Sequence, residues 1–108
     1  MKRKGPLTEA TYYILLALQK PNHGYGMMQM IEKITEGEVE IGPGTLYGAL
    51  GKLEKQGAIH TTVCPDSSDD RRKCYVLTEE GHTLLVDEYH RMKRVVAISH
   101  EWVKEEAK

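Results

Sequence analysis

Residues 42–57 read Gly-Pro-Gly-Thr-Leu-Tyr-Gly-Ala-Leu-Gly-Lys-Leu-Glu-Lys-Gln-Gly, and this stretch decides the fold of the chain. Leu46, Leu50 and Leu53 recur at helical spacing, so they predict an amphipathic helix that buries a leucine stripe. The proline near its start suits a first helical turn, where a missing N–H has no partner to lose. The closing glycine is suited to end the helix, which is therefore expected to fill the whole stretch.

The opposite face of this predicted helix is unusual for a surface helix. It carries two glycines and two lysines, and its members are Thr45, Tyr47, Gly48, Gly51, Lys52 and Lys55. Each glycine costs about 1 kcal/mol of helix stability relative to alanine but permits close approach of another surface. The major groove of DNA is one such surface. A helix–helix contact inside the fold is another, and the pattern by itself favours neither.

A β-hairpin is predicted directly after this helix. Residues 60–64 and 71–77 read as two short strands that flank a polar turn. Arg71, Arg72 and Lys73 open the second strand, where a hairpin could contact DNA phosphates, although such a triplet alone is more typical of a solvated charge run. A hairpin directly after a third helix is the order of a winged helix-turn-helix domain.

Two helices are predicted before this segment. Thr8 is a candidate N-cap for the first, and the run that follows is apolar on nearly every side, so this helix is expected to be buried on more than one face. The second helix begins near Tyr25. His23, just before it, is expected to be a cap or a turn hydrogen bonder rather than a metal ligand.

A long final helix is predicted from Thr78 to about Lys104, which would extend on the order of 40 Å. Apolar positions alternate steps of four and three, as in a coiled-coil seam, at Leu85, Tyr89, Met92, Val96, Ser99 and Val103. Such a rod is too long for a core of this size to cover, so two chains are expected to pair through it. The chain is expected to divide into residues 1–77 and a dimerisation helix, residues 78–108.

Composition limits the function classes. The 108 residues suit one core, and 15 basic against 16 acidic residues give a net charge of −1, so a nucleic-acid surface must be a local patch. No apolar run approaches a membrane span, no signal-peptide core is present, and two cysteines make no disulfide framework, so we expect a cytoplasmic protein. No catalytic motif occurs, so neither an enzyme nor a cofactor is expected.

The two cysteines lie on either side of the hairpin turn. Cys64 and Cys74 could face each other across the hairpin and, with His60, form a metal or redox sensor. Their separation is not a zinc-ligand spacing, however. We expect small residues that fill the strands, and no metal site.

Four motifs then follow one another in a characteristic order: His23-Gly24-Tyr25-Gly26, Pro43-Gly44-Thr45-Leu46-Tyr47, Arg71-Arg72-Lys73 and Leu77-Thr78-Glu79-Glu80-Gly81. With this ordered set, which covers nearly the whole chain, the protein resembles a PadR-family transcriptional regulator of the short kind. The resemblance implies a mainly α fold with a small β-hairpin: a winged helix-turn-helix DNA-binding domain plus a long C-terminal dimerisation helix.

The resemblance also implies a homodimeric repressor on a palindromic operator in double-stranded DNA. Carried onto this sequence, the DNA contacts are Tyr25, Gly44, Thr45, Tyr47, Lys52, Lys55, Arg71, Arg72 and Lys73. Relatives often place a basic residue at Gly48 or Gly51, so base contacts are expected to be fewer here. A small aromatic effector is expected in a cavity lined by Tyr13, Met92, Ile98 and Trp102. Trp102 alone is more typical of an interface anchor.

One other function class remains open from the sequence. A winged-helix module could bind another protein through the same helix, without DNA. The basic residues of the third helix and the hairpin favour DNA over this alternative.

Overall fold

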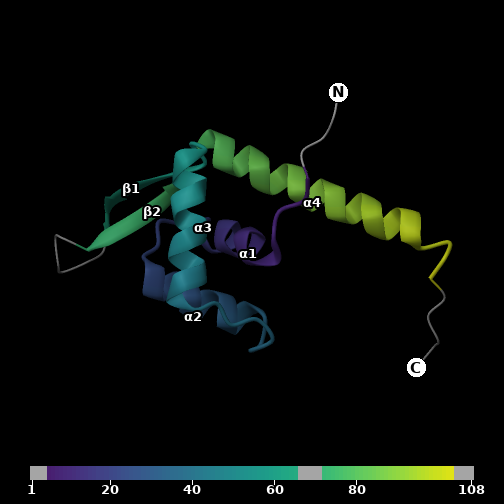
Figure 1. The fold of residues 1–108 in the computed structure, drawn as a ribbon, viewed down its shortest axis with the longest axis horizontal. Helices are drawn as coiled ribbons and strands as arrows, with labels where there is room; N and C mark the ends of the chain where they lie inside the picture. The colour runs from purple at the N-terminus through teal and green to yellow at the C-terminus, as the bar shows by residue number, and fades with distance from the viewer. Residues whose placement is uncertain (1–4, 66–71, 104–108) are drawn as a thin grey trace.

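The computed structural model describes residues 5–65 and 72–103. The elements follow the order α1 (Glu9–Ala17), α2 (Gly24–Ile34), α3 (Pro43–Lys55), β1 (Ile59–Val63), β2 (Lys73–Leu77) and α4 (Glu79–Ser99). Figure 1 shows α1, α2 and α3 gathered in one body, with the hairpin at one end and α4 extending beyond the other. The predicted mainly α fold with one small hairpin is confirmed.

Capping side chains set where three of the helices begin. Thr8 and Thr78 each accept a hydrogen bond of 3.1 Å from the backbone N–H three residues further on. His23 caps α2, because its Nδ1 accepts a bond of 3.1 Å from the N–H of Gly26. The capping roles predicted for Thr8 and His23 are confirmed, and Thr78 caps α4 in the same way as Thr8 caps α1.

The core lies where α1, α2 and α3 meet. Ile14 and Leu15 of α1 have no exposed surface, as expected for a helix that is apolar on nearly every side. The leucine stripe of α3 is buried with them at Leu46, Leu50 and Leu53. Burying each such side chain contributes about 1.5–3 kcal/mol, so this shared face holds the three helices together.

The hairpin is attached to this body by backbone hydrogen bonds. β1 and β2 pair antiparallel with Ile59 opposite Leu77. On the other edge of β2, Asn22 forms a single bridge with Tyr75: Asn22 N–H donates to the Tyr75 carbonyl oxygen at 3.2 Å, and Tyr75 N–H donates back at 2.8 Å. The segment between α1 and α2 therefore anchors the base of the hairpin.

α4 is shorter than the sequence pattern predicted. It ends at Ser99 after 21 residues, about 31 Å, so the prediction that it reaches Lys104 is wrong. Its last turn contains no basic residue, and Glu101 follows at the negative end of the helix dipole, where a carboxylate disfavours further turns. Val103 consequently lies beyond the helix rather than on its seam.

The first half of α4 belongs to the core of its own chain. Leu85 is 7% exposed and packs with the buried residues of the other helices, so it is unavailable to a second chain as a seam residue. Gly81 lies directly against the chain before β1, because a Cβ there would collide with the carbonyl oxygen of Ala58. The apolar stripe of α4 thus starts inside the fold and continues onto its surface.

Candidate nucleic-acid interface

α3 presents the glycine-rich face to solvent. No described group outside the local helix lies within 4 Å of where a Cβ would stand on Gly44, Gly48 or Gly51. A helix–helix contact within the described parts of the chain therefore does not explain these glycines. Gly48 and Gly51 instead border a shallow hollow of about 580 Å³, whose lining residues are Tyr47, Gly48, Gly51, Lys52, Glu54 and Lys55.

Tyr47 takes part in this face and also in the fold. Half of its surface is exposed, yet its ring and hydroxyl lie over Gly24 at the start of α2. A Cβ on Gly24 would overlap the Tyr47 hydroxyl, so only glycine fits there without a shift. Tyr47 therefore fixes α2 against α3, a role that the motif residues did not reveal.

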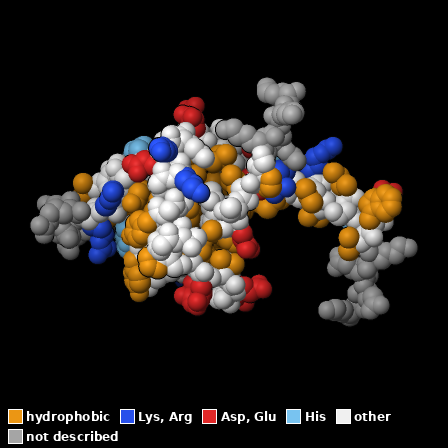
Figure 2. Space-filling model, viewed as in Figure 1, with side chains coloured by type: hydrophobic (Ala, Val, Ile, Leu, Met, Phe, Trp, Pro, Cys, Tyr) orange, Lys and Arg blue, Asp and Glu red, His pale blue; other side chains and the backbone are white. Residues whose placement is uncertain are grey.

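The hairpin adds a second group of cations. Arg72 and Lys73 are both exposed, whereas Arg71 lies outside the described residues. Figure 2 shows Lys and Arg side chains over the hairpin and α3 on one face of the molecule. Lys52 and Lys55 are the exposed lysines of α3. Together these residues form a local basic patch on a chain with almost no net charge.

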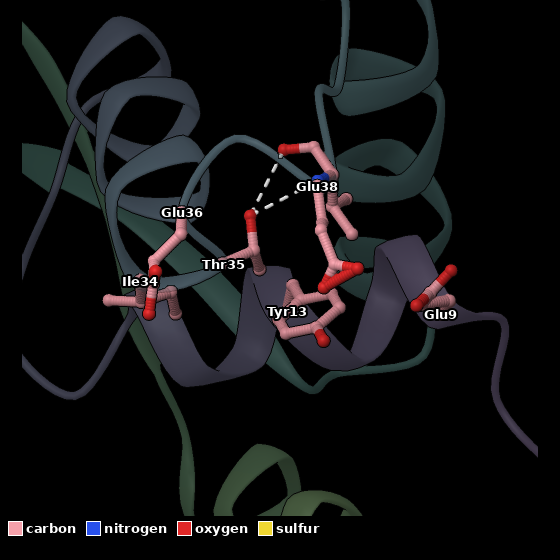
Figure 3. Close-up of a pocket in the computed structure, with 7 residues that line it drawn as sticks. Glu9, Tyr13, Ile34, Thr35, Glu36 and Glu38 are labelled. Atoms are coloured by element: carbon pink, nitrogen blue, oxygen red, sulfur yellow. Dashed lines mark hydrogen bonds between the residues drawn. The ribbon is translucent and has the colours of Figure 1, made fainter.

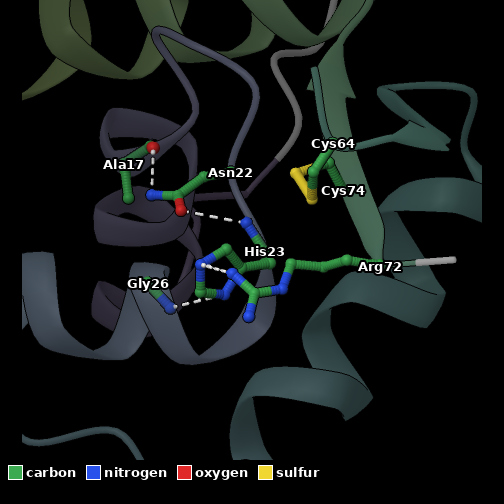
Figure 4. The surroundings of a disulfide bond; sticks show 7 residues. All are labelled: Ala17, Asn22, His23, Gly26, Cys64, Arg72 and Cys74. Atoms are coloured by element: carbon green, nitrogen blue, oxygen red, sulfur yellow. Dashed lines mark hydrogen bonds between the residues drawn. A yellow bond between two sulfur atoms is a disulfide. The ribbon is translucent and has the colours of Figure 1, made fainter. Parts of the chain in front are cut away.

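Arg72 lies against the residue that caps α2. Its Nη1 is 3.4 Å from Nε2 of His23, as Figure 4 shows. Nδ1 of His23 accepts the capping bond from Gly26, so a neutral imidazole carries its proton on Nε2 and has no lone pair to offer there. His23 therefore cannot accept a hydrogen bond from the Arg72 guanidinium. The guanidinium remains available to an anion such as a phosphate.

Two predicted contacts remain, Thr45 and Tyr25. Thr45 is exposed in the first turn of α3, and Tyr25 lies at the start of α2. Tyr25 is 64% exposed. Its position next to the His23 cap puts it near the positive end of the helix dipole, where an anion is favoured.

A disulfide joins Cys64 to Cys74, with Cα atoms 4.9 Å apart. The expectation that they only fill the strands is therefore wrong. The register explains the pairing: Thr62 stands opposite Cys74, and the N–H of Cys64 extends the ladder by donating to the carbonyl oxygen of Arg72 at 3.1 Å. Both sulfurs thus lie on one side of the hairpin, and both cysteines are buried. In the sequence, the position of one cysteine on each side of the predicted turn was the signal that could have indicated this bond.

A metal centre has no support in the structure. Among residues 5–65 and 72–103, no group of three His, Cys, Asp or Glu side chains is arranged to hold a metal ion. The metal-sensing alternative that joined His60 to the cysteines therefore gains nothing from these parts of the chain.

The residues predicted to line an effector cavity come from both ends of the described chain, and the hollow that Tyr13 lines contains none of the other three. Tyr13 lines a hollow of about 570 Å³ between α1 and the end of α2, and Figure 3 shows that its other walls include Glu9, Glu36 and Glu38. This hollow is acidic rather than apolar. Met92 is half-buried on α4, while Ile98 and Trp102 are exposed at its far end.

The distal half of α4 carries an exposed apolar surface. Tyr89, Val95, Val96 and Ile98 are all exposed, with Val96 at 67%. Just beyond the helix, Trp102 is 80% exposed. Of the other predicted seam residues, Met92 and Ser99 are half-buried.

Two proteins of related sequence match this chain. An uncharacterized 37.1 kDa protein in transposon TN4556 of Streptomyces fradiae is 35% identical over 88 residues, which is 81% of this chain and 24% of that protein. An uncharacterized protein X of Lysinibacillus sphaericus is 31% identical over 84 residues, which is 75% of this chain and 77% of that protein. The chain thus spans about a quarter of the length of the Streptomyces relative.

Solved structures share the fold. A transcriptional regulator from Clostridium thermocellum matches with a TM-score of 0.73 at 25% identity, covering 89% of this chain and 93% of that one. A protein from Streptococcus mutans matches with a TM-score of 0.67 at 29% identity over 96% and 100% of the two chains. A PadR family transcription regulator from Clostridium difficile, 24% identical over 90% and 100%, has a TM-score of 0.75 and shows the likeness of fold.

The family assignment agrees with the winged-helix geometry. Residues 14–87 match the family described as Transcriptional regulator PadR-like, so the match runs from α1 into α4. Members of this family are DNA-binding transcriptional regulators and not enzymes. No helix in the described ranges has the length and apolar character that crossing a membrane requires. The chain belongs to the PadR-like family of transcriptional regulators.

Proposed function

We propose that the protein is a homodimeric repressor that binds a palindromic operator in double-stranded DNA. The observation that carries this proposal is the exposed face of α3, where glycines with open space beside them lie among cations. A major groove about 12 Å wide admits a helix, and the absence of side chains at Gly48 and Gly51 lets the backbone approach the base edges closely.

Each predicted contact has a place in this arrangement. The first residues of a recognition helix read base edges, so Gly44, Thr45 and Tyr47 lie nearest the bases. The cations contact phosphates, and these residues are Lys52, Lys55, Arg71, Arg72 and Lys73. The exposed Tyr25 hydroxyl donates to a phosphate at the start of α2.

The distal half of α4 supports pairing of two chains. A contiguous exposed apolar surface of this kind marks an interface on a small protein. The proposed seam comprises Tyr89, Met92, Val96 and Ser99, with Val103 beyond the helix end, while Leu85 serves the core. The chain thus divides functionally into a DNA-binding part, residues 1–77, and a dimerisation helix, residues 78–108, whose first half is shared with the core.

The proposal includes release from DNA by a small aromatic effector bound where the two chains meet. Met92, Ile98 and Trp102 supply apolar surface on α4, and Tyr13 of α1 would have to reach that surface in the dimer. Trp102 is the only tryptophan, so its fluorescence reports binding directly. A phenolic ligand should quench it at the same concentration that releases operator DNA. Because DNA is the partner, we place the protein in the cytoplasm.

A salt-titrated gel shift on the DNA upstream of the protein's own gene tests the function. The four proposed cations that the structure describes give about eight phosphate contacts per dimer, and Arg71 adds about two more, so log K should fall with log salt at a slope between about −7 and −9. The double change Lys52→Gln/Lys55→Gln removes about four of these contacts and should reduce the slope by about 3 to 4. Lys33→Gln on α2 is the matched control and should leave the slope unchanged.

Two results of the gel shift would contradict this proposal. Absence of a shift at about 50 mM salt would overturn the proposal and favour the protein-binding module instead. A slope that Lys33→Gln lowers as much as the double change would show that the contacts are not confined to α3 and the hairpin.

A further inference from the structure

We propose that Cys64 and Cys74 form a reversible redox site, which in its disulfide form holds the hairpin in the conformation that binds DNA. The inference rests on the proposed function, since it assumes that the hairpin contacts phosphates. Membership of the family does not say whether the bond between Cys64 and Cys74 is formed or broken in the working protein.

The position of the disulfide is the first support. At its base, the hairpin is anchored by the Asn22–Tyr75 bridge. Asn22 is itself fixed, because its Oδ1 accepts from the His23 N–H at 2.9 Å and its Nδ2 donates to the Ala17 carbonyl oxygen at 3.4 Å. Among the described residues, no backbone bridge joins the turn end of the hairpin to the body, and the contact there is that of Arg72 Nη1 with His23 Nε2 at 3.4 Å. There the strands are joined by the disulfide, as Figure 4 shows.

Arg72 connects the disulfide to the proposed DNA contacts. The Arg72 carbonyl oxygen accepts from the N–H of Cys64, so the bonded cysteine positions its backbone directly. Its guanidinium, next to His23, is available to a phosphate. A two-stranded hairpin is marginally stable without further support, so loss of the disulfide should free Arg72 and Lys73 from their fixed positions.

The cellular environment is the second support. Thiols are kept reduced where bacterial DNA lies, and disulfides that do form there are usually transient and catalytic or redox-sensing. The chain has only these two cysteines, so neither has another partner within the chain. The paired hairpin accommodates the bond with the Cα atoms of the two cysteines 4.9 Å apart, so the oxidised form is compatible with the fold.

The reaction is a thiol–disulfide exchange with a low-molecular-weight disulfide such as oxidised glutathione. Cys64, the more exposed of the two at 7% against 2%, attacks one sulfur of the oxidant as a thiolate and releases one glutathione thiolate. The Cys74 thiolate then attacks the Cys64 sulfur and releases the second. In the protein two S–H bonds break and one S–S bond forms. In the oxidant the S–S bond breaks and two S–H bonds form, so two electrons and two protons pass to it and it leaves as two molecules of reduced glutathione.

The test uses the full chain in mixtures of reduced and oxidised glutathione. Acid quenching, alkylation and mass spectrometry count the free thiols, two in the reduced form and none in the oxidised form. Gel shifts on the same samples measure affinity and salt slope. We expect the reduced form to bind at least tenfold more weakly, with a slope lower by about 3 to 4, because Arg72 and Lys73 of both chains no longer hold phosphates.

The double variant Cys64→Ser/Cys74→Ser is the matched control. It should bind like the reduced protein and should not respond to glutathione. The reduced natural chain tests the same state without any mutation, so a folding defect of the variant does not decide the result.

The outcomes separate this inference from the proposed function. Equal affinity and equal salt slope for the oxidised and reduced forms would overturn the redox inference alone. So would a disulfide that persists in a large excess of reduced glutathione. Absence of DNA binding by both forms would overturn the proposed function, and the regulatory role of the disulfide with it.

Discussion

Replacing both exposed glycines of α3 should make the protein more stable and a weaker DNA binder. In Gly48→Ala/Gly51→Ala, each new methyl group enters open space, since no described group outside the local helix lies within 4 Å. Both positions lie inside a 13-residue helix. The gain in stability comes from the helix alone. The loss of DNA affinity comes from the contact between the helix and the surface that approaches it.

The magnitudes follow from these surroundings. Glycine costs about 1 kcal/mol relative to alanine in an exposed helix interior, so the double variant should gain about 1.5–2 kcal/mol in free energy of unfolding. Against DNA, extra methyl groups in a closely packed contact cost about 1–3 kcal/mol. That cost corresponds to a loss of operator affinity of roughly fivefold to 150-fold.

Urea unfolding followed by circular dichroism measures the first effect, at one fixed protein concentration because association contributes to stability. A gel shift at constant salt measures the second. Gly57→Ala is the control: its φ of +80° strains any other residue, so the same change there should destabilise the protein by about 1 kcal/mol. Loss of stability in the double variant would refute the argument from open space. A gain in stability with unchanged operator affinity would show that this face does not meet DNA.

Three further predictions concern contacts elsewhere in the fold. Gly24→Ala should cost about 1–3 kcal/mol by overlapping the Tyr47 ring, and adding Tyr47→Ala should relieve most of that cost while abolishing operator binding; a simple sum of the two losses in urea unfolding would contradict the contact. Val96→Asp should split the dimer in light scattering and leave the fold intact, whereas Leu85→Ala should lower stability by about 2–5 kcal/mol; a dimeric Val96→Asp would exclude this seam. Burial, helped by Tyr89 and Glu88, raises the pKa of Tyr12 above that of a free tyrosine. The neutral hydroxyl therefore contributes to folding stability below about pH 10, and this contribution is lost as pH rises through the raised pKa. Between about pH 9 and pH 11, Tyr12→Phe should lose less stability than the natural chain, and equal losses would contradict the raised pKa.

Local chemistry explains why the helices and their starts were predictable. A threonine or histidine with a free N–H three residues later forms its cap without help from distant residues, as at Thr8, His23 and Thr78. The spacing of Leu46, Leu50 and Leu53 likewise defines one buried face whatever packs against it.

The seam of α4 shows where this local reasoning stopped. Heptad spacing places both Leu85 and Val96 on the seam, although Leu85 is buried in its own chain and Val96 is exposed. Periodicity reports which side of a helix is apolar, but the length of the neighbouring body decides how much of that side is covered. The end of α4 at Ser99 was missed for a related reason, since an apolar repeat continues in the sequence after packing partners have run out.

By itself the sequence determined the order of the helices, the hairpin, the family and the basic residues of the proposed DNA-binding face, because each depends on residue type and spacing along the chain. Tertiary structure alone decided that Tyr47 lies over Gly24, that Arg72 lies against His23, and that Cys64 is bonded to Cys74. These contacts join residues between 10 and 49 positions apart. Strand register and helix packing bring such residues together, and neither is encoded in any single stretch of the chain.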